Sequence, residues 1–385
     1  LKCGKSGIKN ISLFNPGDLP SRIAGQCEVD FTYYKDRKIN FAIHSIKNAI
    51  LHSNKNAKIG VEEFYKEKII NLSIGIGLEL FDMDNMIEFI NNDYLIPQKK
   101  INTPDFLQTP LDFCISKIMD EIKLPLIPFT HISACAASTD AIGSAVINII
   151  NGNSKIAITG GTDSMINPLG LGGFCKLNAL STKNISPARS SSPFDLNRDG
   201  FVLGEGAAFF IIENYEEAKQ RGAQIYGEIL GYGNSFDAYS ISDPHPEGIG
   251  ALIAMEKAIK MSGISIDELS YINAHGTSTP KNDIMETIAI KRLLGDYAYK
   301  VPISSTKSMI GHLISAAGAV ETLAALICAN NSIIHPTINL RNPDPRCDLD
   351  YIPNQYREHK VKYFLKNSFA FGGMNASLLL KNMEN

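Results

Sequence analysis

The sequence lacks any apolar run that approaches the length of about 20 residues needed to cross a bilayer as a helix, so we do not expect it to span a membrane. It also lacks an excess of basic charge, because 37 Lys and Arg stand against 40 Asp and Glu, for a net charge of −3. This balance argues against a polycationic nucleic-acid binder, although it allows a local basic patch for an acidic partner. No segment recurs at a fixed short period, so a repeat solenoid is not expected.

Paired cysteines are also missing, since no C-x-x-C occurs and the seven cysteines are scattered (Cys3, Cys27, Cys114, Cys135, Cys175, Cys328, Cys347). Such a set does not suggest a zinc knuckle or a redox couple. It is typical of a reducing compartment, in which most cysteines are small buried hydrophobic residues and one can be reactive. Because the first residue is Leu1 and not Met, we expect the chain as printed to be processed or trimmed.

What the sequence does contain is an ordinary globular composition, with 385 residues, 44% hydrophobic and 20% charged. At about 150 residues per domain, this length predicts two to three domains or one large composite fold. Strand and helix patterns alternate from about residue 126 and begin again after Gly222. The alternation predicts an α/β fold of two similar halves, residues 1–222 and 223–385.

The element pattern is clearest in the middle and the C-terminal part of the chain. An apolar strand leads through Cys135 into a helix of small residues that ends near Gly152, and strands are predicted at 155–164 and 204–214. The stretch 167–199 that follows is long, glycine-bearing and polar, and no helix or strand is assigned to it. Further helices are expected at 41–53, 248–263, 283–295 and 316–331, and strands at 68–80, 224–233 and 269–273. The segment 363–382 is predicted to form two strands around a glycine turn, and 99–110 to form a loop.

Cys135 is the first candidate nucleophile. It lies between a strand and a helix, with alanines on both sides, so its sulfur is expected at a helix N-terminus with little bulk around it. A free thiol has a pKa of about 8.5, and a helix N-terminus lowers that pKa toward the reactive thiolate. The alternative is a cysteine that is only packed in the core.

Two histidines favour the reactive interpretation. His275 and His312 each follow a predicted strand, as Cys135 does, and ligands bind at that edge of an α/β layer. The remaining six histidines lack this setting (His44, His52, His131, His245, His335, His359). A metal site is the weaker interpretation, because no two of the candidate residues have short ligand spacing along the chain.

Five ordered segments carry a family resemblance: "SACAASTDAIGSA", "SSPFDLNRDGFVLGEGAA", "YINAHGTSTPKND", "SSTKSMIGH" and "NSFAFGGMNASL". They resemble the signatures of the elongating β-ketoacyl-[acyl-carrier-protein] synthases, types I and II and most like type II, within the thiolase-like superfamily. The match runs almost continuously from about Ile132 to Leu380, whereas residues 30–130 resemble the family only loosely. The resemblance implies the thiolase-like fold, two similar halves that form a layered αβαβα core.

The resemblance also implies the main catalytic roles. Cys135 would accept the acyl group, and the backbone N–H groups of Cys135 and Phe371 would form the oxyanion hole. His275 and His312 would donate hydrogen bonds to the enolate left by decarboxylation of a malonyl thioester, a charge that two neutral imidazoles suit. The pair of histidines is distinctive within the superfamily. By the same resemblance, chain-initiating synthases carry a Cys, His, Asn set, and thiolases carry a Cys, His, Cys set.

Supporting roles follow from the same resemblance. Lys307 would set the electrostatics of the site, paired with Glu321, whereas its alternative is a solvated loop lysine. Asp283 and Glu286 would support the catalytic residues from the helix that follows His275.

Substrate binding is implied for four further residues. Thr277 and Thr279 would hydrogen-bond the phosphopantetheine arm, and their alternative is ordinary turn chemistry. Phe371 would act as the gate of the acyl pocket, and Phe174 as a pocket or gate residue.

The sequence departs from the family pattern at three points. Ala370 replaces a usual glycine, and Met374 replaces a usual threonine, so gating and acyl-chain preference become uncertain. Asn178 stands where relatives often carry an arginine for the acidic carrier protein, and Lys176 and Lys183 could substitute for it.

The predicted activity is therefore that of a 3-oxoacyl-[acyl-carrier-protein] synthase that lengthens an acyl chain by two carbons. Its partner would be acyl carrier protein, which supplies 4′-phosphopantetheine, with no tightly bound cofactor or metal, and the family implies a homodimer. The alternatives are a catalytically silent subunit similar to a chain-length factor and a polyketide-type ketosynthase. The abundance of Asn, Ile and Lys favours an organelle, a plastid, apicoplast or mitochondrion, over the bacterial cytoplasm.

Overall fold

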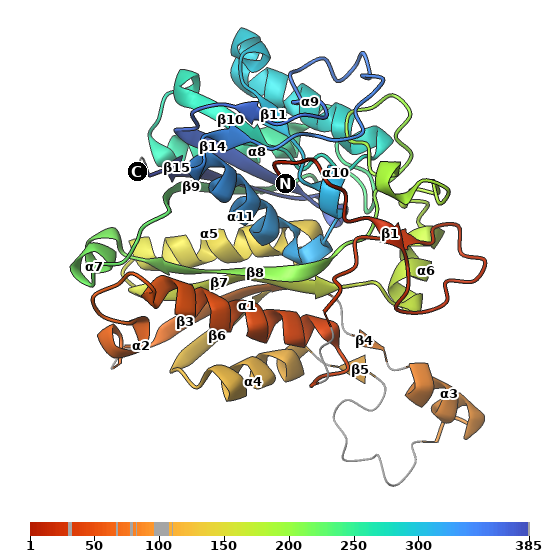
Figure 1. The fold of residues 1–385 in the computed structure, drawn as a ribbon, viewed down its shortest axis with the longest axis horizontal. Helices are drawn as coiled ribbons and strands as arrows, with labels where there is room; N and C mark the ends of the chain where they lie inside the picture. Colours follow the sequence, from red (N-terminus) through yellow and green to blue (C-terminus); the bar gives the residue numbers. More distant parts are fainter. Residues whose placement is uncertain are drawn as a thin grey trace.

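The computed structural model describes residues 1–29, 33–66, 68–77, 80–81, 83–95, 108–109 and 111–383. Two β-sheets alternate with three helical layers, which gives the αβαβα arrangement of the thiolase-like fold (Figure 1). No helix in these described ranges is long and apolar enough to cross a membrane.

The N-terminal sheet has the strand order β6-β3-β7-β8, built from β3 (Ile70–Ile76), β6 (Leu126–His131), β7 (Ile156–Ser164) and β8 (Glu205–Glu213). The C-terminal sheet has the order β11-β10-β14-β15-β9, built from β9 (Gly227–Phe236), β10 (Leu269–Asn273), β11 (Ile303–Ser304), β14 (Tyr363–Phe369) and β15 (Met374–Asn382).

Strand directions repeat between the two sheets. Strand β3 runs parallel to β6 and β7, as β10 does to β11 and β14, and an antiparallel strand follows in each sheet, β8 or β15. Strand β9 adds to β15, whereas β8 pairs within the described residues only with β7. The sheets use residues 70–213 and 227–382, so the predicted boundary at 222 falls between them, and the division into two domains stays a prediction.

Helices cover both faces of each sheet (Figure 1). The outer face of the N-terminal sheet carries α1 (Arg37–Asn54), with α4 (Leu111–Ile122) packed beside it. The central layer is α5 (Ala137–Ile150) and α11 (Ala317–Asn330). The outer face of the C-terminal sheet carries α8 (Ile249–Ser262) and, next to it, α9 (Pro280–Leu294).

The smaller elements complete the described chain. The short helices are α2 (Val61–Phe64), α3 (Met83–Asn91), α6 (Pro168–Lys176), α7 (Tyr215–Gln220) and α10 (Lys307–Ile310). The two-stranded pairs are β1 (Lys9–Asn10) with β2 (Ile23–Ala24), β4 (Leu80–Phe81) with β5 (Gln108–Thr109), and β12 (Ile333–Ile334) with β13 (Arg357–Glu358).

Small residues let the two central helices approach closely. A Cβ added to Gly318 at the start of α11 would lie 2.1 Å from Oγ1 of Thr139 at the start of α5. A Cβ on Gly143 would lie 2.2 Å from the ring of Tyr232 on β9. The close contact of the helix N-termini places the residues just before them, including Cys135 and His312, near one another.

Most predicted elements are present, with shifted ends. The predicted helices at 248–263, 283–295 and 316–331 correspond to α8, α9 and α11, and α1 begins four residues before the predicted start at 41. The stretch 167–199, to which no element was assigned from the sequence, contains α6, a helix with Asn167 as its N-cap and Pro168 in its first turn. The three glycines of α6 do not predict a helix, because glycine has low helix propensity. Of the predicted loop 99–110, only 108–109 lie within the described residues, and they form β5.

Candidate active site

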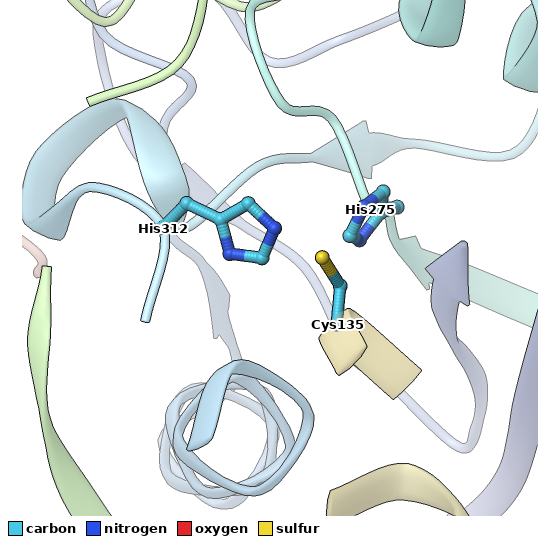
Figure 2. A group of neighbouring side chains, drawn as sticks. All are labelled: Cys135, His275 and His312. Carbon is cyan, nitrogen blue, oxygen red and sulfur yellow. The ribbon is translucent and has the colours of Figure 1, made fainter. Parts of the chain in front are cut away.

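Three reactive side chains meet where strands of the two sheets end. Cys135 follows β6, His275 follows β10 and His312 follows β11, as the sequence predicts. The sulfur of Cys135 and one ring nitrogen of each histidine all lie within 4.8 Å of one another. The two imidazole centroids are 5.3 Å apart, with planes at 83°, and Figure 2 shows the sulfur beside both rings.

Cys135 is held in a sharp turn. The preceding residue, Ala134, has a φ of 45°, and the N–H of Ala136 closes the turn on the carbonyl of Ser133. This left-handed conformation strains a residue with a Cβ, a sign of functional geometry. Ile314 has a φ of 44° just after His312 and before α11, so the C-terminal half repeats this turn.

The predicted lowering of the Cys135 pKa is wrong. Burial raises the pKa of the Cys135 thiol to about 11, against the opposing effects of the Lys307 charge and of the backbone N–H groups of Phe371 and Cys135. The side chain is 4% exposed, so loss of water outweighs the helix N-terminus. The resting nucleophile is therefore the thiol, and a nearby base must take its proton.

Both imidazoles have one ring nitrogen occupied by a donor. Nδ1 of His275 lies 3.2 Å from the Lys307 ammonium, and Nδ1 of His312 accepts the N–H of Ile314 at 3.1 Å. An ammonium and an amide can only donate, so each Nδ1 is an acceptor and each Nε2 carries the hydrogen. Nε2 of His312 has no hydrogen-bond partner among the described residues, which leaves it open to a substrate oxygen.

The imidazoles are also neutral. Burial, and then the Lys307 charge, hold the pKa of His275 and of His312 well below the usual value. Two neutral N–H donors beside a thiol can stabilise an oxyanion or enolate without carrying charge in the resting state.

Lys307 is buried and paired, as the sequence predicts, rather than solvated. Its ammonium lies 2.5 Å from Oε1 of Glu321 on α11 and donates to the backbone oxygen of His275 at 2.7 Å. A second lysine, Lys366 on β14, lies 2.9 Å from the other oxygen of Glu321. Lys366 was not predicted as a site residue, although a lysine directly after Phe364 and Leu365 inside a predicted strand was a visible signal.

The two predicted acidic supports act on the backbone around His275. The carboxylate oxygens of Glu286 accept the N–H groups of His275 and Gly276, both at 2.8 Å. Asp283 accepts the N–H groups of Thr277 at 3.1 Å and Phe194 at 2.8 Å. Burial raises the pKa of Glu286 to about 7.

Arg198 was missed by the sequence analysis. It is buried, lies 3.5 Å from Asp283 and 2.8 Å from Asp344, and donates to the carbonyl oxygens of Thr279 and Pro280. It therefore braces the start of α9 and the turn that carries His275.

Thr277 and Thr279 bind one another, with their hydroxyl oxygens 2.9 Å apart. The hydroxyl of Thr279 also accepts the N–H of Asn282 as the N-cap of α9. Part of their chemistry is thus ordinary helix capping, and their contact with a phosphopantetheine arm stays a prediction.

The predicted gate residues flank an aromatic bridge. Phe174 packs edge-on against Phe201 with centroids 5.5 Å apart, and Phe201 packs against His312 at 5.2 Å and lies 6.5 Å from Phe371. Phe201, absent from the sequence predictions, joins these rings to the apolar cluster that contains Cys135.

The departures at the gate cause no backbone strain. Ala370 has a φ of −117°, which any residue adopts, whereas Gly372 and Gly373 carry the positive φ values of the loop, 81° and 79°. Met374 is partly exposed at the start of β15.

The expected basic patch is less uniform than predicted. Asn178 and Lys176 are exposed just after and at the end of α6. Lys183 lies 3.4 Å from Asp199 and donates to the carbonyl of Asn197, so part of its charge is already compensated.

Sequence spacing does not exclude a metal site in this protein. The fold brings one thiol and two imidazoles within 4.8 Å of one another, a donor set that also suits soft metals. The expectation of no metal rests instead on the chemistry of the family.

Two family models match the chain. Residues 128–218 match the N-terminal domain of β-ketoacyl synthases and residues 226–341 match the C-terminal domain. Fold and site define an enzyme of the thiolase-like class. The chain belongs to the β-ketoacyl synthase family.

Individual proteins agree with this assignment. A 3-oxoacyl-[acyl-carrier-protein] synthase 2 of Synechocystis is 40% identical over 99% of this chain and 92% of its own length. The chloroplastic 3-oxoacyl-[acyl-carrier-protein] synthase II of Arabidopsis thaliana is 35% identical over 98% of this chain and 70% of its own length. A solved complex of a type II PKS acyl-carrier protein with its ketosynthase contains a chain with a TM-score of 0.87 and 31% identity, covering 99% of this chain and 93% of its own length.

Proposed function

We propose that the protein is an elongating 3-oxoacyl-[acyl-carrier-protein] synthase of type II fatty acid synthesis, an acyltransferase that condenses with decarboxylation. The observation that carries this proposal is the convergence of Cys135, His275 and His312, with both imidazoles arranged as neutral Nε2–H donors. Full-length relatives named 3-oxoacyl-[acyl-carrier-protein] synthase 2 support it.

The first half-reaction transfers an acyl group to Cys135. The Cys135 sulfur attacks the thioester carbonyl as its thiol loses the proton, and the departing pantetheine thiolate takes up that proton. One C–S bond forms as another breaks, so the enzyme mainly supplies position and thiolate. The N–H groups of Cys135 and Phe371, which face the sulfur, suit the tetrahedral oxyanion, for which one such donor is worth about 2.7 to 4 kcal/mol.

The second half-reaction breaks the bond between the malonyl α-carbon and its carboxylate. Carbon dioxide leaves, and the electron pair forms an enolate whose oxygen accepts the Nε2–H groups of His275 and His312. The α-carbon then attacks the acyl carbonyl, and the Cys135 thiolate leaves and takes up a proton from water. A 3-oxoacyl thioester with two more carbons remains on the carrier protein.

Acyl carrier protein would deliver both substrates on 4′-phosphopantetheine, and no tightly bound cofactor is expected. Thr277 and Thr279 lie beside His275 and could hydrogen-bond the arm. Lys176, exposed at the end of α6 near the predicted pocket residue Phe174, suits an acidic carrier protein better than Lys183, which is paired with Asp199.

The intact triad speaks against the alternative of a silent subunit similar to a chain-length factor, because such relatives usually lack the cysteine. The alternative of a polyketide-type ketosynthase is supported by similar solved structures, including the type II PKS complex. The names of the full-length relatives favour fatty acid synthesis.

A homodimer through β6 is part of the proposal. This strand is the outer strand of its sheet, and its side chains Ile127 and Phe129 are both 44% exposed. An open, apolar sheet edge invites pairing, and a two-fold axis there would join the N-terminal sheets of two copies.

The relatives come from more than one compartment. They include a chloroplastic protein and bacterial proteins, so an organelle matrix or stroma and the bacterial cytoplasm both remain compatible. We favour the organelle on the composition of the chain.

Incubation with acyl-carrier protein and malonyl-carrier protein tests the function. We expect an acyl adduct on the peptide that contains Cys135 and a 3-oxoacyl product, both absent from the Cys135→Ala variant. Wild-type protein that forms neither species would refute the proposal.

A further inference from the structure

Lys366 is a fully buried lysine in the middle of strand β14. Its ammonium contacts three oxygens: the carbonyl of Asn367 at 2.6 Å, Oγ of Ser368 at 2.5 Å and Oε2 of Glu321 at 2.9 Å. A buried ammonium is costly unless it is paired and hydrogen-bonded, so this arrangement requires a reason.

The contacts form a continuous chain that ends at a catalytic imidazole. Lys366 and Lys307 share the two oxygens of Glu321, and Lys307 donates to the backbone oxygen of His275 and lies 3.2 Å from its Nδ1. The side chains of all three charged residues are at most 1% exposed. Two cations and one anion leave one positive charge in excess directly behind the reacting groups.

Few other charged groups face Lys366. Glu286 on α9 is the second carboxylate near it, and its oxygens are used by the N–H groups of His275 and Gly276 and the amide of Asn367. Across the neighbouring strands, Lys366 is in register with Asn273 of β10 and Leu378 of β15. Among the described residues, other titratable groups around the cluster are the imidazoles of His275 and His312 themselves, Tyr271 of β10, whose hydroxyl contacts Ser304, and the buried His335, which also lies beside Ser304 and interacts with Glu321.

We propose that Lys366 is a positioning residue, a tethered counter-cation that holds the Glu321–Lys307–His275 chain in place and adds positive potential where the enolate forms. The inference rests on the proposed function. It assigns a role to a residue that touches neither the substrate nor the reacting atoms.

Geometry gives the first reason. Without an ammonium at this point, a carboxylate oxygen, a carbonyl oxygen and a hydroxyl oxygen would face one another with no cation between them. The carboxylate of Glu321 would then turn or draw Lys307 away from His275. Loss of the Lys307 contact would free Nδ1 of His275 and let the imidazole carry its hydrogen on the wrong nitrogen.

Charge gives the second reason. The positive charges of Lys307 and Lys366 both lower the pKa of His275 and His312, after the larger effect of burial. Removal of one cation raises these imidazole pKa values, so protonation begins at higher pH and the acid limb of the condensation moves upward. Burial lowers the pKa of Lys366 itself to about 8, so the wild-type enzyme loses this charge as the pH rises through that value.

The Lys366→Met variant tests the charge while keeping the length of the side chain. Decarboxylation and condensation should fall about tenfold at pH 7, with the acid limb about one pH unit higher, because one neighbouring charge shifts a buried pKa by about that amount. Acylation of Cys135 should change much less, since Lys366 is not among the groups that shift the thiol pKa. The control is Lys362→Met, four residues earlier with an exposed side chain.

The Lys366→Ala variant tests whether a free cation can replace the tethered one. Ammonium or methylammonium chloride at about 50 mM should restore most of the lost decarboxylation, whereas sodium chloride at the same ionic strength should not. A variant that still acylates Cys135 but gains nothing from either amine would overturn the proposal, as would a Lys366→Met variant with the wild-type pH profile.

A titration separates this inference from the proposed function. With ¹³C-labelled histidine, the NMR signals of His275 and His312 should begin to shift at higher pH in Lys366→Met than in wild type. Identical titrations would sink the inference even in an active enzyme. Wild-type protein that makes no 3-oxoacyl product would sink the proposed function, and the titration would still decide whether Lys366 controls the imidazoles.

Discussion

Lys307 lies 3.2 Å from Nδ1 of His275, and this contact decides which ring nitrogen of the histidine faces the substrate as a donor. The backbone N–H of Ile314 does the same for His312 at 3.1 Å. One imidazole is thus fixed by a charged side chain and the other by the backbone. The two histidines can perform the same task while responding differently to substitution around them.

Replacement of His312 by Ala should separate the half-reactions. The thiol and the oxyanion donors remain, so we expect acylation of Cys135 to persist, while decarboxylation falls by about 10²-fold or more, the usual effect of losing one donor to a developing oxyanion. Intact-mass measurement reports the adduct, and release of labelled carbon dioxide reports the second step. Full condensation by this variant would remove His312 from the mechanism.

Alkylation of Cys135 should follow an unusual pH dependence. Because burial raises the thiol pKa to about 11, the thiolate fraction keeps increasing as the pH rises toward that value. The rate of iodoacetamide labelling at Cys135 should therefore still rise between about pH 8 and pH 10, with the exposed Cys3 as an internal control. A plateau that is complete by pH 8 would show a lowered pKa instead.

Exchanges between alanine and glycine should have different effects at positions 370 and 372, which lie on either side of the predicted gate residue Phe371. Ala370 has a φ of −117°, so Ala370→Gly should cost only about 0.5 to 1 kcal/mol of unfolding free energy, through backbone entropy. Gly372 has a φ of 81°, so Gly372→Ala should cost about 1 to 2 kcal/mol and slow condensation by displacing Phe371. Denaturant unfolding measures both costs, and equal effects at the two positions would contradict this description of the loop.

The proposed homodimer should depend on the outer edge of β6. A charge at Phe129, in Phe129→Asp, should shift the protein from dimer to monomer in analytical ultracentrifugation. The matched control is Ile185→Asp, since Ile185 is a highly exposed loop residue, 99% accessible. A wild-type monomer, or a Phe129→Asp variant that still dimerises, would contradict pairing through β6.

Much of the fold could be predicted from local patterns. Apolar strands followed by helices with glycine ends predict α8 to within one residue at each end and α9 to within three, because their periodicity and stop signals are local. Helix α6 could not be predicted in this way, since its glycines oppose a helix that tertiary contacts and the Asn167 cap stabilise. The sequence pattern before residue 125 does not predict α4, because the burial of this helix depends on its packing against α1.

The site was predictable in its identities and not in its electrostatics. Cys135, His275 and His312 could be placed on one edge because each follows a strand. The pKa of Cys135 depends on how deeply the folded chain buries it, which a helix N-terminus in the sequence does not reveal. Lys366 and Arg198 were not predicted as site residues, because their partners Glu321 and Asp344 are distant in the sequence.

The central claim is that one active site decarboxylates a malonyl thioester and joins the resulting carbanion to the acyl group on Cys135. The most direct test is the ratio of labelled carbon dioxide released to 3-oxoacyl-carrier protein formed in a single turnover of the acylated enzyme. The mechanism predicts one carbon dioxide for each product in the wild-type enzyme, and no 3-oxoacyl product from Cys135→Ala that has been given the same acyl donor. Product without carbon dioxide release, or no product from the acylated wild-type enzyme, would contradict the claim.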